Sequence, residues 1–508
     1  MRRRNQPWPR PRLRPGPLIL QAFAWDMAPD ASHWRYLAQH AQAIADLGVT
    51  IIWLPPAYKG NFGLDDVGYG VYDLYDLGEF DQKGTIPTKY GTRDEYLAAI
   101  DALHEAGIAV CADIVLNHRM GADATETVRA TPINPQDRHQ ALGDPETIQA
   151  WTRFTFPGRG GAYSDFTWDW TCFHGIDWDE ATQRKGLWLF EGKHWNESVN
   201  TEFGNFDYLM GCDVHVTEPR VSEELDRWGR WYVETTGVDA LRLDAVKHVG
   251  SDFYARWLED LRASTGRRLP AVGEYWSGDV RELEGYLERV PNVMLFDVPL
   301  HYHLHDASIS DGNVDLSRLW ENTLTASRPD KSVTFVETRH PARAVLGLHG
   351  RPLVQGSAYA SSSFNEAGVP CVFWGDLLGS PDSDDLPPCV NCRSSCRFAP
   401  ARPLARSTTL STTLTSWALP AKASPRSPAP AAPSSSPTGW PQRRPSTWAI
   451  VTPARSGSAS SEATRRCASR TTGHSPAWSA TAASASTCRA PERITSPGLV
   501  HGDEAGER

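Results

Sequence analysis

The sequence predicts a (β/α)8 barrel, and three observations carry this prediction. Short apolar segments alternate with amphipathic segments of helical spacing, which is the pattern of parallel βαβ units. About eight of the apolar segments are strand candidates, a number that favours a closed barrel over a doubly wound sheet. The first of them is not followed by the G-x-G-x-x-G fingerprint of a dinucleotide-binding fold.

The predicted elements follow one another along the chain. We expect strands at 17–25, 49–56, 108–118, 238–244, 270–275, 293–297, 333–337 and 369–374. We expect helices at 34–47, 93–106, 221–235 and 252–263. The first two helices are followed by Gly48 and Gly107, and glycine is the usual residue just past a helix C-terminus.

The rhythm of strands and helices divides the chain into four parts. Residues 18–118 and 208–386 form the predicted barrel, and 119–207, rich in Gly, Trp, Asp and Thr, is a predicted subdomain inserted after the third strand. Loops that follow barrel strands lie on the face that carries active sites, so the insertion should shape a substrate cleft. The basic, Pro-rich segment 1–17 and the low-complexity segment 387–508 are predicted to be disordered.

Composition excludes some functions. The chain of 508 residues has 51 basic and 61 acidic residues, a net charge of −10, whereas nucleic-acid binders carry clustered basic patches. No apolar run approaches the roughly 18 residues of a membrane span. The basic start is followed by only a short apolar stretch, so no secretory signal is evident. We expect a cytoplasmic monomer, with an extracellular location open if the true start differs.

Two carboxylates stand at the ends of two predicted strands. The stretch GVDALRLDAVKH at 237–248 places Arg242 and Asp244 at alternate positions, which aims both at one side of the strand. The stretch AVGEYW at 271–276 places Glu274 at the end of the next strand. Two acids at the open end of a barrel are the minimum equipment for cleaving a glycosidic bond. The alternative for either acid alone is a structural ion pair.

Four blocks of sequence resemble the α-amylase family of glycoside hydrolases, in particular its liquefying, bacterial-type subgroup. They are DVGYGVYDLYDLGEFDQKGT at 66–85, DIVLNH at 113–118, GNFDYLMGCD at 204–213 with LRLDAVKH at 241–248, and GEYW at 273–276. The resemblance covers about residues 18–336 and a fragment at 365–380. It implies retaining hydrolysis of internal α-1,4-glucosidic bonds in starch- or glycogen-like glucans.

The resemblance also implies roles for individual residues. Asp244 corresponds to the nucleophile and Glu274 to the general acid/base. The implied substrate-binding residues are Tyr69, His118, Arg242, Lys247 and His248. A cation at Arg242 would keep Asp244 ionised. Glu274 should keep its proton in a less compensated environment, which Tyr275 and Trp276 could supply.

A calcium ion is implied where the insertion joins the barrel. Its ligands would be Asn117, Asp207, Asp213 and the backbone carbonyl of His248, since Ca²⁺ selects hard oxygen ligands. The family often adds an aspartate from the insertion, but this chain has His174 there, which leaves the full ligand set and a second metal open. Alternatively, Asp207 and Asp213 are ordinary loop caps.

Two segments depart from the family pattern. After the strand SVTFVE the family has a His-Asp pair, whereas this chain continues Thr338-Arg339-His340-Pro341 and is aberrant over 338–364. After Pro388 the family's antiparallel β domain is replaced by the low-complexity tail. With suitably chosen codons, the residues from Thr338 onward and those from Ser407 to Pro420 can be re-read in a neighbouring frame as family-like sequence. Three alternatives therefore stay open: a transglycosylase on the same scaffold, a glucan-binding protein without turnover, and an inactive product of a frame-disrupted gene.

Overall fold

The computed structural model describes residues 16–310, 313–338, 358, 362 and 367–378. The predicted leader, the aberrant segment 338–364 and the tail 387–508 lie wholly or largely outside these residues. None of the helices in the described ranges is long and apolar enough to cross a membrane.

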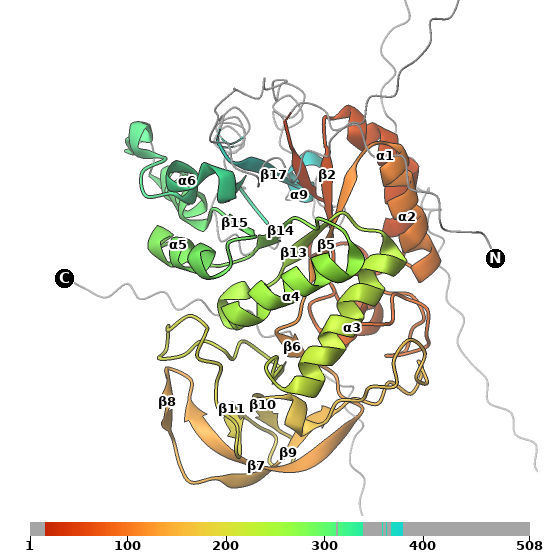
Figure 1. The fold of residues 1–508 in the computed structure, drawn as a ribbon, viewed down its shortest axis with the longest axis vertical. Coiled ribbons are helices and arrows are strands. Elements are labelled where there is room, and N and C mark those ends of the chain that lie inside the picture. Colours follow the sequence, from red (N-terminus) through yellow and green to blue (C-terminus); the bar gives the residue numbers. More distant parts are fainter. Residues whose placement is uncertain (1–15, 311–312, 339–357, 359–361, 363–366, 379–508) are drawn as a thin grey trace, which may run out of the picture. The chain divides into compact units, whose positions relative to one another are not determined.

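In the described part of the chain, eight parallel strands close into a barrel, as the sequence predicts (Figure 1). Each strand pairs with the barrel strand before it and the one after it in the sequence, and the last pairs with the first. The strands are β1 (Ile19–Gln21), β2 (Ile51–Leu54), β5 (Ala109–Ile114), β13 (Ala240–Leu243), β14 (Ala271–Gly273), β15 (Met294–Phe296), β16 (Ser332–Phe335) and β17 (Val369–Phe373).

Apolar side chains lie on both faces of these strands. In β2, Ile51 and Trp53 belong to one buried cluster, together with residues of most other barrel strands, and fill the barrel interior. Their neighbours Ile52 and Leu54 belong to a second cluster that includes the surrounding helices. Strands covered on both faces read as continuous apolar runs, which is why they could be predicted from the sequence.

Helices surround the strands, and their ends follow from local sequence (Figure 1). The four predicted helices are α1 (His33–Asp46), α2 (Arg93–Glu105), α3 (Pro219–Thr236) and α4 (Ser251–Thr265). Thr92 and Glu95 form a capping box at the start of α2, and Gly237, with a φ of 71°, ends α3. The structure adds α5 (Val280–Arg289), α6 (Val298–Ile309), α7 (Leu324–Ser327) and α9 (Trp374–Leu378).

The segment between β5 and α3 forms an antiparallel sheet of its own (Figure 1). Its strands are β7 (Ala124–Asn134), β8 (Asp137–Ala141), β9 (Glu146–Arg153), β10 (Gly175–Asp179) and β11 (Arg184–Phe190). Two short pairs flank it: β3 (Lys59–Gly60) with β4 (Val71–Asp73), and β6 (His118–Arg119) with β12 (Cys212–Asp213). The β6–β12 pair ties the entry of the insertion to its exit.

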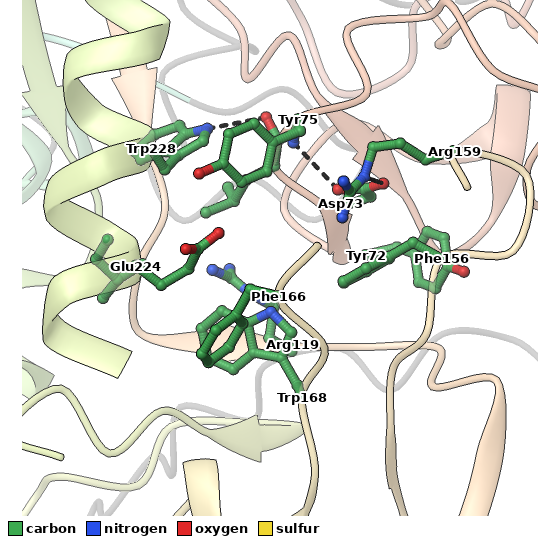
Figure 2. Close-up of a pocket in the computed structure, with 12 residues that line it drawn as sticks. Tyr72, Asp73, Tyr75, Arg119, Phe156, Arg159, Phe166, Trp168, Glu224 and Trp228 are labelled. Carbon is green, nitrogen blue, oxygen red and sulfur yellow. Dashed lines mark hydrogen bonds and ion pairs between the residues drawn. The ribbon is translucent and has the colours of Figure 1, made fainter. Parts of the chain in front are cut away.

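A small pocket marks a joint between this insertion, β4 and α3 (Figure 2). Arg159 of the insertion donates from Nε to Asp73 Oδ2 at 2.8 Å, and both side chains are almost fully buried. Across the pocket, Trp228 of α3 donates from Nε1 to the Leu74 carbonyl at 2.9 Å. The cavity measures about 10 Å³, room for one water molecule, so it cannot admit a sugar.

Replacing Arg159 with methionine should destabilise this joint by about 3–5 kcal/mol, because the buried Asp73 carboxylate would lose its charged partner. Thermal or urea unfolding measures the loss. The matched control is Arg281→Met, since Arg281 also pairs with an aspartate but its side chain is 84% exposed. The control should leave stability nearly unchanged, because solvent screens an exposed ion pair. Equal effects of the two substitutions would contradict the assignment of Arg159 as a structural ion-pair residue.

Candidate active site

One buried guanidinium gathers three carboxylates at the C-terminal ends of the barrel strands. Arg242 of β13 donates from Nη1 to Asp113 Oδ1 at 2.8 Å and to Asp244 Oδ1 at 2.6 Å. Its Nη2 donates to Glu274 Oε2 at 2.5 Å. Asp113 lies opposite Arg242 in the β5–β13 register. The structure thus brings the two predicted catalytic acids together on the two terminal nitrogens of one arginine.

Strand pairing explains how the chain places these acids. Asp244 immediately follows β13 and its backbone N–H donates to the Ile114 carbonyl, while the Glu274 N–H donates to the Leu243 carbonyl. Ala245 then adopts a φ of 50°, a left-handed conformation uncommon for residues other than glycine. This turn lets the Val246 N–H donate to the Glu274 carbonyl at 3.0 Å, which links the ends of the two strands.

The electrostatics of the two acids are coupled through this arrangement. Burial raises the pKa of Asp244 to about 7; the Arg242 cation opposes this rise and the Glu274 charge adds to it. The expectation that Glu274 has a less compensated environment is wrong, because Arg242 contacts it as closely as it contacts Asp244. The polar ends of the two aromatic residues are engaged elsewhere: Tyr275 OH accepts from Asn200, and Trp276 donates to Tyr302.

Replacing Arg242 with glutamine should move the acidic limb of the kcat/KM profile to higher pH. A neighbouring cation favours the ionised carboxylate, so its removal raises the pKa of Asp244 by about one unit or more. Activity that depends on ionised Asp244 is then lost at a higher pH as the solution is acidified. Arg242→Lys is the matched control, since it keeps the positive charge and should shift the limb less. An unmoved limb in the glutamine variant would contradict this role.

The predicted substrate-binding residues lie around this cluster, and each already makes hydrogen bonds within the protein. Tyr69 is in direct contact, because its OH donates to Asp113 Oδ2 at 2.8 Å. The His118 ring is buried and its Nε2 lies 2.7 Å from the Tyr69 carbonyl, so this nitrogen is already engaged. Lys247 donates from Nζ to Glu202 at 2.5 Å and to the Trp276 carbonyl at 3.2 Å. His248 Nδ1 lies 2.8 Å from the Phe206 carbonyl.

Burial fixes the charge of both histidines. It lowers the pKa of His118 to about 4 and that of His248 to about 3, although in each case a backbone carbonyl partly offsets the effect. Both rings are therefore neutral near pH 7. Among these predicted residues, the Arg242 guanidinium is the fixed positive charge that contacts both acids.

Sequence reasoning missed an aromatic residue beside the site. Trp25, which follows β1, stacks on Tyr69 with ring centroids 5.4 Å apart and an interplanar angle of 6°. Its side chain is 37% exposed, which is unusual for tryptophan and leaves part of its face to solvent. The signal was its position at the C-terminal end of a predicted barrel strand, the end where the other site residues cluster. Trp53 was also missed; its Nε1 donates to Asp113 at 3.0 Å.

The structure brings two of the predicted metal ligands, Asp207 and Asp213, together with His174, which was not among them. The side chains of Asp207 and Asp213 are buried, and His174 Nδ1 lies 2.9 Å from Asp207 Oδ2 and 2.8 Å from Asp213 Oδ2. His248 is adjacent through its contact with Phe206. Within the described residues, the buried Asn117 Oδ1 has no hydrogen-bond partner.

His174, Asp207 and Asp213 form a group that could hold a metal ion, but as they are placed they do not fit calcium. The unpartnered oxygen of Asn117 favours an ion, but a buried water would satisfy it equally. Calcium requires six to eight oxygen ligands, whereas an imidazole nitrogen already contacts an oxygen of each carboxylate. Burial alone would lower the pKa of His174, yet the hydrogen bonds that its ring donates to Asp207 and Asp213, and the negative charges of these two residues, raise it to about 9.

Comparisons of the sequence and the fold with known proteins point to one family. The family described as "Alpha amylase, catalytic domain" matches residues 28–383. The α-amylase of Geobacillus stearothermophilus is 47% identical over 368 residues, covering 72% of this chain and 67% of that protein. The cytoplasmic α-amylase of Escherichia coli K12 is 43% identical over 371 residues, covering 72% and 75%. The crystal structure of Gamma-CGTASE from alkalophilic Bacillus clarkii, with a TM-score of 0.50 at 15% identity over 75% of this chain and 56% of that chain, shares the fold. The chain belongs to the α-amylase family of glycoside hydrolases.

Proposed function

We propose that this protein hydrolyses internal α-1,4-glucosidic bonds of starch- or glycogen-like glucans, with retention of anomeric configuration. Asp244 is the nucleophile and Glu274 the general acid/base. The observation that carries this proposal is the sharing of one guanidinium by the two acids. Family membership and the names of the relatives, most of them α-amylases, support the substrate class.

The shared arginine is compatible with a retaining mechanism, which needs its two acids close together. Retaining glycosidases hold their two carboxyl groups about 5–5.5 Å apart, whereas inverting enzymes separate them by about 6.5–9.5 Å to admit a water molecule. Asp244 and Glu274 bind neighbouring nitrogens of Arg242 at 2.6 and 2.5 Å, which keeps the two carboxyl groups close. Asp244 would attack the anomeric carbon, and Glu274 would protonate the departing oxygen.

The coupled charges supply the starting protonation state. The charge on Glu274 raises the pKa of Asp244, and the two acids resist ionising together. One proton shared between them leaves one carboxylate to attack and one acid to donate, which is what the first step needs. Positive charge that develops at the anomeric carbon stabilises the ionised form of whichever acid faces it. We assign that position to Asp244 on the family correspondence.

Other residues would bind the glucan around the bond that breaks. The exposed part of Trp25 and its stacked partner Tyr69 offer flat aromatic surface next to the acids, and such surface suits the apolar face of a glucose ring. We propose that Tyr69 and His118 line the sugar subsite at the cleavage point. Lys247 and His248 would contact the leaving-group side, and Asp113 would orient Arg242 without taking part in the chemistry.

The experiment that tests this proposal follows the first products of starch cleavage. Proton NMR in the first minutes should show α-anomeric reducing ends, because two displacements restore the configuration. Loss of iodine staining should outpace the release of reducing ends, as internal cleavage requires. Predominantly β-anomeric products would refute retention. Longer oligosaccharides that accumulate in the presence of added maltose would instead identify a transglycosylase. A chain that binds starch without any turnover would refute the hydrolase assignment.

A further inference from the structure

A second joint between the barrel and the inserted sheet, apart from the one at Arg159, contains a buried cluster whose central side chain is a histidine. His174 precedes β10, Asp207 lies in the segment that returns to the barrel, and Asp213 lies in β12. The side chains of His174, Asp207 and Asp213 are no more than 5% exposed. The cluster thus joins three segments that the sequence separates by up to 39 residues.

His174 is fixed between the two carboxylates by its backbone as well as its ring. Its N–H donates to the Asp213 carbonyl at 2.9 Å, and its carbonyl accepts from the Phe190 N–H at 2.9 Å. The ring nitrogen Nδ1 is therefore held within hydrogen-bond distance of Asp207 Oδ2 and Asp213 Oδ2. A cation placed between these two oxygens would have to break both contacts.

Protein groups already contact the carboxylates of the cluster. Asp207 Oδ2 also accepts from the Asn196 N–H at 2.8 Å. Burial lowers the pKa of the Arg138 guanidinium, and the negative charges of Asp213 and Asp207 oppose this lowering. On the other side, the centroids of the His174 and His215 rings lie 4.2 Å apart. His215 Nδ1 in turn lies 2.9 Å from Lys193 Nζ. The carboxylate oxygens of Asp207 and Asp213 thus already contact nitrogen donors, from His174 and from the Asn196 backbone.

We propose that the His174 side chain stands in place of a calcium ion in this chain, so that the joint is held without bound metal. One imidazole N–H bridges the two carboxylates that a Ca²⁺ ion would otherwise bridge. An aspartate at position 174 would add an oxygen ligand, free the oxygens of Asp207 and Asp213, and leave only oxygens where the imidazole nitrogen now lies. A set of oxygens has the chemistry that Ca²⁺ selects.

The test compares the full chain with His174→Asp by metal analysis and thermal unfolding. After dialysis against EDTA, the melting temperature of the unmodified chain should stay the same, and millimolar CaCl₂ should not raise it. His174→Asp should melt at a lower temperature without calcium and regain several degrees with it, because a ligand that binds only the folded state stabilises it. His174→Asn, which offers one neutral amide oxygen, is the matched control and should respond to calcium much less.

Several results would overturn the proposal. One is stoichiometric calcium in the purified unmodified chain, together with a lower melting temperature after EDTA. Another is stabilisation of the unmodified chain, but not of His174→Asn, by Zn²⁺ or Mn²⁺, because His174 would then be a metal ligand. A folded His174→Asp that ignores calcium would also contradict the exchange. If His174→Asp does not fold, equilibrium dialysis of the unmodified chain against calcium still decides the question.

Discussion

Replacing Asp244 with asparagine should lower kcat on starch by about 10⁴-fold or more. The amide is a poor nucleophile, so the glycosyl-enzyme bond cannot form, and loss of a covalent nucleophile usually removes most of the catalysis. Asparagine has the same shape and its oxygen can still accept from Arg242, which now contacts Asp244 at 2.6 Å. Steady-state release of reducing sugar measures the loss.

Two measurements separate this loss from misfolding. The melting temperature of Asp244→Asn should stay within a few degrees of the unmodified chain, because Arg242 keeps its contacts with Asp113 and Glu274. Binding of maltoheptaose, followed by tryptophan fluorescence, should persist, since Trp25 and Tyr69 are unchanged. Activity within tenfold of the unmodified chain would refute the nucleophile assignment.

Replacing Glu274 with alanine should lower kcat on starch by about 10²–10⁴-fold, the usual contribution of general acid–base catalysis. A sugar hydroxyl is a poor leaving group and needs the proton that Glu274 would donate. A glucosyl fluoride needs no such proton, so the first displacement should be nearly unaffected with that substrate. The second displacement still lacks a base to activate water, and the glycosyl-enzyme should accumulate.

Azide provides the decisive readout for Glu274→Ala. This anion needs no general base and fits the space that the missing side chain leaves, so it should restore turnover of the fluoride. Its product should be the α-glycosyl azide, the configuration that attack on a β-linked intermediate gives. Glu274→Gln, which fills that space, should be rescued much less. A β-azide product would mean that azide attacked the substrate directly and would contradict the role of Glu274.

The barrel could be predicted because its strands are buried on both faces. The run at 49–56 is apolar at nearly every position, and the structure places Ile51 inside the barrel and Ile52 against the helices. The helices α5 and α6 were not predicted. In α5, Leu283 and Leu287 lie at helical spacing on one buried face, a signal that the sequence analysis did not use. In α6 the apolar residues and histidines leave no clear polar face, so its helical spacing was difficult to recognise.

The strands of the insertion carry a signal that the sequence analysis did not use. In β9 the side chains of Ile148, Ala150 and Thr152 are buried in alternation with more exposed ones. The buried threonine, and Trp151 facing solvent, obscure this period of two. In the site, the proximity of Asp244 and Glu274 followed from strand order. The contact of Arg242 with Glu274 did not, because it depends on side-chain conformation across two strands.

The most direct test of the account is to trap the covalent intermediate and locate it. A 5-fluoro-α-glucosyl fluoride slows both displacements, because the ring fluorine destabilises the developing positive charge, while the good leaving group still allows the first one. Mass spectrometry of the digested protein should find one fluoroglucosyl unit on the peptide that contains Asp244, and none in Asp244→Asn. A label on Glu274, Asp113 or any other residue would contradict the account. So would steady turnover with inversion and no label.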